Sequence, residues 1–287
     1  MAVIIGCIVV VLCTFGGYVA LGGKLAVLWQ PFEVVIIVGA AIGAYVIANT
    51  TPVLKGTVNT IKASLKGPSY KKDDYVELLG VLYQILKLAK TKGNLALEQH
   101  IENPEESSLF QQFPNFSKNH HAVEFLCDYL RMVTLGAVNP HEMESLMDEE
   151  LETHHQEHHK LASALQTMAD GMPALGIVAA VLGVIKTMGS ITEPPEILGK
   201  LIGGALVGTF LGVWISYGFL APIASKAQAT FEAESKYFQC IKAGLLAHLH
   251  GSAPAVSIEF ARKALLSSDR PTFYEVEEAV AELPPIA

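Results

Sequence analysis

The sequence predicts an all-α membrane protein, and two observations support this fold class. The first is composition, because 51% of the 287 residues are hydrophobic and only 17% are charged, whereas an ordinary soluble domain carries about 25% charged residues. The second is the distribution of charge. Residues 1–23, 34–54 and 201–225 contain no charged side chain, and residues 171–192 contain only Lys186. About 20 apolar residues in a helix span the hydrocarbon core, so we expect four transmembrane helices.

Residues 1–23 have a second interpretation, as a cleaved signal peptide. No Lys or Arg precedes their apolar stretch, and the stretch is longer than the apolar part of such a signal. We therefore expect residues 1–23 to remain in the mature chain as its first transmembrane helix.

Net charge and cysteine content exclude two further classes of protein. A net charge of −8 does not suit a protein that binds the phosphate backbone of nucleic acids. The cysteines form no CxxC pair, so we expect small buried side chains rather than a disulfide framework. They are Cys7, Cys13, Cys127 and Cys240.

Lysine and arginine set the expected orientation, because they accumulate on the cytoplasmic side of a membrane. Five lysines follow the second apolar run before any acidic residue, whereas the connections 24–33 and 193–200 carry one lysine each. We therefore expect both termini in the cytoplasm. The predicted parts are two transmembrane helices with a short periplasmic loop (1–54), a cytoplasmic helical domain (55–170), the third and fourth transmembrane helices (171–225) and C-terminal cytoplasmic helices (226–287).

Capping signals predict where the cytoplasmic helices begin and end. Asp73 or Asp74 can cap a helix that Gly93 ends, and its apolar positions recur at three- and four-residue steps. Three other segments have the sequence of a helix start, with a capping side chain followed three residues later by glutamate. They are Asn103–Glu106, Asn139–Glu142 and Thr272–Glu275.

Two long helices are expected to extend out of the membrane. The helix that starts at Pro140 runs on toward the third apolar run, and residues 223–250 continue the fourth. The run His154–His159 places two pairs of histidines four residues apart, a spacing that suits zinc. No further ligand is fixed nearby and the HExxH order is absent. We therefore favour a polar helical stretch without a metal ion.

The apolar runs are rich in small residues and lack acids. Gly204, Gly208 and Gly212 are four residues apart, which is typical of close helix packing within one subunit or between subunits. No Asp or Glu lies inside any of the four runs, and Glu33 directly precedes the second. Because intramembrane carboxylates usually mark cation paths, we expect the acid of any such path to come from a partner protein.

Pro173 and Pro222 lie at the inner ends of the third and fourth runs. Proline removes a backbone donor and permits a bend in a helix. On spacing alone, the two prolines either form a mechanical joint or simply end the membrane spans.

Two segments resemble the third and fourth transmembrane helices of MotA, a family of stator subunits of the bacterial flagellar motor. They are residues 170–190 (DGMPALGIVAAVLGVIKTMGS) and 205–224 (ALVGTFLGVWISYGFLAPIA). The cytoplasmic strings 97–107, 146–154 and 256–271 resemble the same family. The resemblance covers nearly the whole chain, in the expected order.

The resemblance implies a homo-oligomeric ring in the bacterial inner membrane, by expectation a pentamer, around a pair of MotB-like partners anchored to peptidoglycan. An aspartate in the partner's transmembrane helix supplies the ion-binding acid. Ion flow then turns the ring against the rotor through the switch protein FliG. No cofactor is implied besides the transported ion.

The resemblance also assigns roles to individual residues. Pro173 and Pro222 match the family prolines that couple ion flow to motion. Thr209 matches the threonine that faces the partner's aspartate, and Tyr217 matches a pore-facing aromatic residue. Glu150 matches an acid of the inner helix, with a role in the ion path and its coupling.

Two charged residues are implied to face the rotor, and one apolar residue bears on the ion. Lys90 and Glu98 match the rotor-facing charges, with Lys90 in place of the arginine of well-studied members. Without the resemblance both are ordinary surface charges. Sodium-driven relatives have Gly-Thr where this chain has Ala179-Ala180. Because Ala180 lacks the oxygen that a partly dehydrated sodium ion needs, we expect the transported ion to be H⁺.

The sequence bears on three other function classes. An energiser of the TolQ/ExbB kind shares the core pair of helices, but it has three spans and an outward N-terminus. A self-contained transporter is disfavoured because the runs lack acids. An enzyme is not expected, since the sequence contains no GxGxxG, P-loop, HExxH or Ser/His/Asp arrangement.

Overall fold

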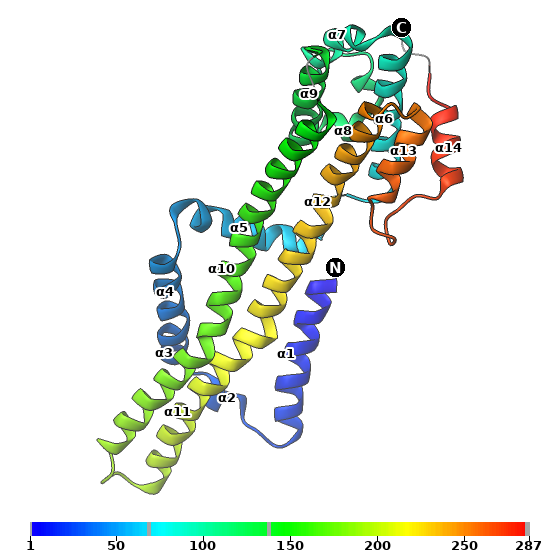
Figure 1. Cartoon of the computed structure of the whole chain (residues 1–287). Helices are drawn as coiled ribbons and strands as arrows, with labels where there is room; N and C mark the ends of the chain where they lie inside the picture. The colour runs from blue at the N-terminus through cyan, green and yellow to red at the C-terminus, as the bar shows by residue number, and fades with distance from the viewer. Residues whose placement is uncertain (1, 68–69, 137–138, 285–287) are drawn as a thin grey trace. The chain divides into compact units, whose positions relative to one another are not determined.

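The computed structural model shows an all-helical chain (Figure 1). The residues that it describes are 2–67, 70–136 and 139–284. Every regular element within them is a helix, as predicted. The chain divides into two compact units, the first comprising Met1–Gly67 with Glu157–Thr230, and the second Pro68–Gln156 with Phe231–Ala287.

The first unit holds the four apolar runs. Its elements up to residue 67 are α1 (Ala2–Ala20), α2 (Leu25–Leu28), α3 (Pro31–Val34), the π-helix η1 (Val35–Gly39), α4 (Ala40–Ala48) and α5 (Thr51–Lys66). The others are α10 (Pro140–Met188) from Glu157 onward, α11 (Pro195–Ile215), the π-helix η4 (Ser216–Leu220) and the start of α12 (Ala221–Leu249). The two long helices predicted beyond the third and fourth runs are therefore confirmed as α10 and α12.

Four helical stretches are long and apolar enough to cross a membrane. They are Ala2–Ala20, Leu25–Ala48, Pro140–Met188 and Pro195–Leu249. The second stretch begins and ends earlier than the predicted run 34–54. Pro31 stands at the start of a helical turn, where its missing N–H costs nothing. Asn49 then leaves the helix with an extended backbone.

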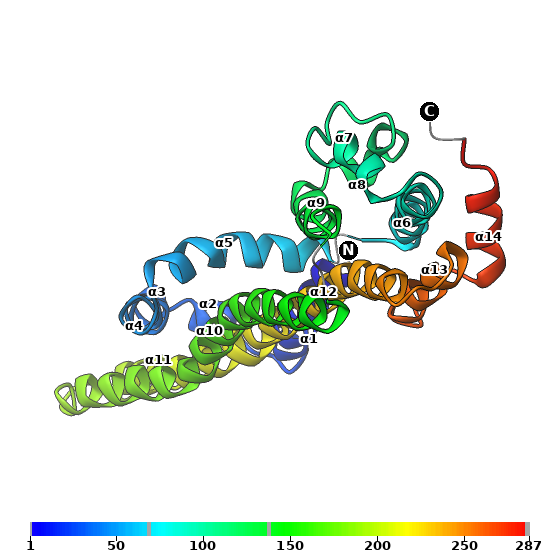
Figure 2. The ribbon, with the colours of Figure 1, turned by 45° about the horizontal axis from the view of Figure 1, so that its top comes forward.

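Helices α10 and α11 pack with their backbones in contact. A Cβ built on Gly212 would lie 2.7 Å from the carbonyl oxygen of Met172 and 2.8 Å from Cα of Gly176. Only glycine fits at such a crossing. Both views show the two helices side by side (Figures 1 and 2). Of the two packing roles left open for the small residues, packing within one subunit is thus shown.

Helix α1 contributes no buried residue to the first unit. Its contact with η4 and α11 includes Trp214, whose indole Nε1 donates to the hydroxyl of Thr14 at 3.1 Å. The ring of Phe15 lies edge-on to Trp214 with centroids 4.9 Å apart. Cys13 is exposed and Cys7 partly exposed on this helix, so the expectation of buried cysteines is wrong there. Both residues lie on a helix apolar enough to face lipid.

The second unit is built around α6 (Lys72–Lys92), which α13 (Pro254–Lys263) and α14 (Phe273–Ala281) contact (Figures 1 and 2). Its other elements are η2 (Asn94–Leu97), α7 (Glu98–Ile101), η3 (Phe110–Gln112), α8 (Pro114–Ser117), α9 (His120–Thr134) and the adjoining parts of α10 and α12. Buried residues occur all around α6 rather than along one stripe, because other helices cover several of its faces.

Two cysteines lie in the core of this unit, as predicted. Cys127 and Cys240 are free and buried. Burial raises the pKa of the Cys127 thiol to about 12 and raises that of Cys240 further. Both therefore stay as neutral thiols and act as small apolar side chains.

Most of the predicted helix caps are confirmed, and the N-cap of α6 differs from the prediction. Thr272–Glu275 is confirmed as a capping box, and the side chain of Asn139 accepts from His141 N at 3.0 Å where α10 begins. Helix α6 ends before Gly93, which has a φ of +87°, as predicted. Its N-cap is Lys71 rather than an aspartate, and Asp74 accepts from Lys71 N at 2.8 Å.

The predicted helix start at Asn103–Glu106 is wrong. These residues form a turn, in which Glu106 N donates to the carbonyl of Asn103. The hydroxyl of Ser107 then accepts from the N–H groups of Leu109 and Phe110 and bonds Nδ1 of His100. Because Ser107 pairs these donors locally, the chain turns instead of continuing as a helix.

The start of α14 predicts a pH effect on stability. Glu275 pairs with Lys72 at 2.7 Å and accepts from the N–H and hydroxyl of Thr272, which together lower its pKa from 4.5 to about 2. A carboxyl with a lowered pKa stabilises the folded state above its unfolded pKa, and this contribution is lost as pH falls through the folded value. Glu275→Gln should therefore lower Tm at pH 7, and the difference from wild type should shrink between pH 4.5 and pH 2.

The control for this effect is Glu277→Gln, which removes an exposed carboxylate from the same helix. It should leave the pH dependence of Tm unchanged. An E275Q deficit that stays constant down to pH 2 would show that the carboxylate is not the stabilising group.

Candidate functional site

The centre of the candidate site is a proline inside α10. Pro173 has no N–H, so the carbonyl of Ala169, four residues earlier, loses its helical partner. Ser216 supplies a replacement: its hydroxyl donates to that carbonyl at 2.6 Å, and Ser216 and Ala169 are both 0% exposed. The position of Pro173 identifies the free carbonyl from sequence alone, but nothing in the sequence identifies Ser216 as its donor.

Ser216 is the first residue of η4, where the helix widens by one residue. The carbonyl of Ser216 accepts from the N–H of Ala221, five residues later. Pro222 follows directly and is exposed. Such π-turns are frequent at functional sites. The second predicted proline therefore lies beside a distorted turn that is bonded to the first proline's helix.

Ala180 lies close to Gly208, the residue before the predicted threonine. A Cβ built on Gly208, the residue before Thr209, would lie 3.2 Å from the backbone nitrogen of Ala180. The structure thus places Ala180 at the crossing of α10 and α11 next to the residue that precedes Thr209. Tyr217 is 61% exposed, so it is free to face another chain.

Glu33 has a different position from the one that the sequence indicated. It does not mark the edge of an apolar run but lies within the membrane-capable stretch Leu25–Ala48. Its Oε2 is buried and has no hydrogen-bond partner in the described part of the chain. The structure therefore places an acid inside a membrane-capable helical stretch, where the sequence predicted none. A charge-free run has to end at a charged residue, but a helix does not.

Glu150 belongs to the second unit, whereas the other residues predicted for the ion path belong to the first. It is on α10 and accepts a hydrogen bond from the hydroxyl of Tyr129 on α9. Burial, together with this bond, raises the pKa of the Tyr129 phenol. Glu150 thus fastens α9 to α10, while Pro173 belongs to the first unit.

The two residues predicted to face the rotor are both exposed in the second unit. Lys90 is in the last turn of α6 and Glu98 is the first residue of α7. The intervening η2 turn presents Leu95, which is 74% exposed. Burial, with a smaller effect of Lys90, lowers the pKa of His248. Lys90, Leu95 and Glu98 are thus exposed side chains of one short segment, two of them charged and one apolar.

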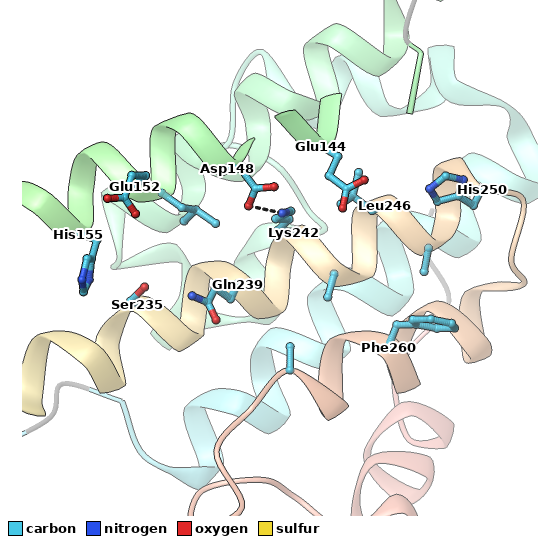
Figure 3. A pocket seen from close by; sticks show the side chains of 14 residues that line it. Glu144, Asp148, Glu152, His155, Ser235, Gln239, Lys242, Leu246, His250 and Phe260 are labelled. Carbon is cyan, nitrogen blue, oxygen red and sulfur yellow. Dashed lines mark hydrogen bonds and ion pairs between the residues drawn. The ribbon is translucent and has the colours of Figure 1, made fainter. Parts of the chain in front are cut away.

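A groove of about 730 Å³ opens in the same unit, lined by α10, α12 and α13 (Figure 3). Glu144, Asp148 and Glu152 of α10 lie along it. Lys242 of α12 forms an ion pair with Asp148. The groove is therefore acidic on one wall and only partly neutralised by the other.

The histidine run on α10 divides between different surroundings. His155 lines the groove of Figure 3, whereas the ring of His154 lies 6.2 Å from that of Phe238. Within the described residues, no group of three or more His, Cys, Asp or Glu side chains could hold a metal ion.

Comparisons with known proteins agree with this architecture. Residues 4–93 match the family model "Motility protein A N-terminal", and residues 117–240 match "MotA/TolQ/ExbB proton channel family". Two solved structures have the same fold. "Structure of C. jejuni MotAB" matches with a TM-score of 0.78 at 20% identity, covering 94% of this chain and 98% of that one. The flagellar MotAB stator complex from Bacillus subtilis matches with a TM-score of 0.75 at 27% identity, covering 93% and 96%.

Curated relatives match over almost the entire chain. Motility protein A of Escherichia coli K12 is 42% identical over 280 residues, covering 98% of this chain and 95% of the relative. Motility protein A of Salmonella typhimurium is 43% identical with the same coverage. Chemotaxis protein LafT of Vibrio parahaemolyticus is 36% identical over 278 residues, covering 97% and 98%. The chain belongs to the motility protein A (MotA) family.

Proposed function

We propose that this chain is a stator subunit of the bacterial flagellar motor, which conducts protons with a MotB-like partner and converts their flow into torque. The observation that carries this proposal is the pair α10 and α11, packed backbone to backbone around Pro173 with the bond from Ser216 across them. A tightly packed apolar pair with a joint at its centre can transmit a small displacement along two long helices. The relatives' names and the MotAB structures support this reading.

The partner and the ring are part of the same proposal. A MotB-like protein anchored to peptidoglycan contributes the ion-binding aspartate, and copies of this chain form a pentameric ring around it. The ring lies in the inner membrane, with four spans per subunit and both termini in the cytoplasm. The four membrane-capable stretches and the similarity to MotAB complexes support this arrangement. The transported ion is H⁺, and no cofactor takes part.

Proton coupling has a direct test in swimming cells. Ala180 offers no side-chain oxygen to a sodium ion, so swimming speed should be independent of external sodium. It should fall to zero when a protonophore collapses the proton gradient. Speed that tracks sodium, or that stops with a sodium-channel blocker, would overturn proton coupling while leaving the stator assignment intact.

Contact with the rotor protein FliG is tested through Glu98. Glu98→Lys should reduce swimming several-fold, because an attractive charge becomes repulsive, while the amount of assembled complex stays unchanged. A charge reversal on the facing rotor residue should restore part of the speed. Glu277→Lys, the same reversal at another exposed site of the second unit, is the control and should swim normally. Full speed of the E98K variant would remove Glu98 from the rotor interface.

An energiser of the TolQ/ExbB kind remains the alternative function, since the matched channel model also covers that family. Four membrane-capable stretches, rather than three spans, and 42% identity to a motility protein favour the stator. Expression with its partner in a stator-deleted strain decides between them. Restored swimming supports the stator, whereas rescue only of outer-membrane integrity supports the energiser.

A further inference from the structure

The two glycines Gly204 and Gly208 of α11 form a seat for two polar side chains at the start of the second apolar stretch, Gln30 at the N-cap of α3 and Glu33 within α3. A Cβ built on Gly204 would lie 3.1 Å from Nε2 of Gln30, and one built on Gly208 would lie 2.9 Å from Oε2 of Glu33. Any larger residue at 208 would have to displace this carboxyl group. The glycine spacing that the sequence shows thus does more than bring helices together: it accommodates an amide and an acid.

The acid in this glycine seat lies beside the predicted ion path. The same Cβ position on Gly208 is 3.0 Å from Cβ of Ala179 and 3.2 Å from the backbone nitrogen of Ala180. Thr209 is the next residue on α11. Glu33 therefore lies at the crossing of α10 and α11 where Gly208, the neighbour of Thr209 in the chain, approaches Ala180.

The state of this carboxyl group is restricted by its surroundings. Its Oε2 is buried and lacks a hydrogen-bond partner in the described part of the chain. The residue as a whole is partly exposed. A buried ionised oxygen without a hydrogen bond is costly, which favours a carboxyl group that binds a proton or has a cation nearby. Between residues 171 and 188, Lys186 is the charged residue of α10. On α11 the charged residues are Glu196 and Lys200, both in the first turns of the helix.

We propose that Glu33 is a second proton-binding site of the stator, a carboxyl group that exchanges protons with the path next to Ala180 and Thr209. This proposal rests on the proposed function and adds a proton carrier that belongs to this chain. Proton flow then involves two acids, the partner's aspartate and Glu33. The neutral amide of Gln30, seated on Gly204, holds no proton to exchange and only fills its half of the seat.

Proton uptake by vesicles containing the chain and its MotB-like partner tests the proposal. Glu33→Gln keeps the shape and a neutral group but cannot release a proton, so uptake should fall about tenfold or more. Glu33→Asp keeps an acid and should retain most of the uptake. Glu196→Gln, which removes an exposed carboxylate at the start of α11, is the matched control and should behave as wild type. Full uptake by E33Q would overturn the proposal, because a purely structural protonated acid is well replaced by an amide.

A second measurement uses the unmodified sequence and does not depend on variants that assemble. A hydrophobic carbodiimide adds to protonated carboxyl groups in apolar surroundings, and mass spectrometry locates the adduct. Glu33 should be labelled at neutral pH, less so as pH rises, and Glu196 should not be. Absence of label at Glu33 would overturn the proposal even if E33Q fails to assemble. If wild-type vesicles take up no protons, the proposed function fails, while the label still reports whether Glu33 holds a proton.

Discussion

Valine at position 212 should prevent the packing of α10 against α11 and with it the assembly of the protein. The added side chain would start 2.7 Å from the carbonyl oxygen of Met172 and 2.8 Å from Cα of Gly176. Both are backbone atoms, so no rotation of a side chain relieves the overlap. Overpacking costs about 1–3 kcal/mol even where side chains can move, and we expect about 3 kcal/mol or more here.

The matched control is Gly199→Val on the same helix, because an added Cβ there meets no atom within 4 Å. Both variants carry the same helix-propensity change from glycine to valine, so their difference isolates the helix contact. The measurement is Tm of the purified chain in detergent, together with the amount recovered from the membrane fraction. Equal stability of G212V and G199V would mean that the two backbones do not touch in the assembled protein.

The contrast between positions 212 and 199 also shows what sequence reasoning can and cannot locate. Both are glycines of α11, and the four-residue spacing of Gly204, Gly208 and Gly212 predicts a helix contact without saying which glycine makes it. Which glycine carries the contact depends on where Gly176 of another helix crosses α11, and that is a property of the fold. The apolar runs and the long helix from Pro140 were predictable because composition and period are local.

Other features escaped prediction because they depend on distant partners. Sequence alone puts Glu33 at the edge of a span, because a charged residue ends a charge-free run by definition. In the structure Glu33 lies within the membrane-capable stretch Leu25–Ala48, with its carboxyl group against Gly208 of α11. The false helix start at Asn103 followed a valid local rule, which the hydrogen bonds of Ser107 override. In each case a residue far along the sequence, or a competing side chain, decides the outcome.

Pro173→Ala should leave the complex assembled but abolish torque. Alanine restores an N–H at residue 173, which can bond the carbonyl of Ala169 within α10. An alanine is favoured over proline inside a helix by about 3 kcal/mol. Ser216 already pairs that carbonyl, so the net gain in stability should be smaller. We therefore expect a Tm equal to or above that of wild type, with no swimming.

This combination distinguishes a mechanical joint from the simple end of a span. If Pro173 only ended a span, its replacement would change stability and leave motility intact. Pro195→Ala is the control, because Pro195 stands at the first position of α11, where no helical hydrogen bond is missing. Swimming speed and complex abundance of the two variants are compared in one strain. Normal swimming of the P173A variant would refute the joint, since a straight, fully bonded α10 would then suffice for torque.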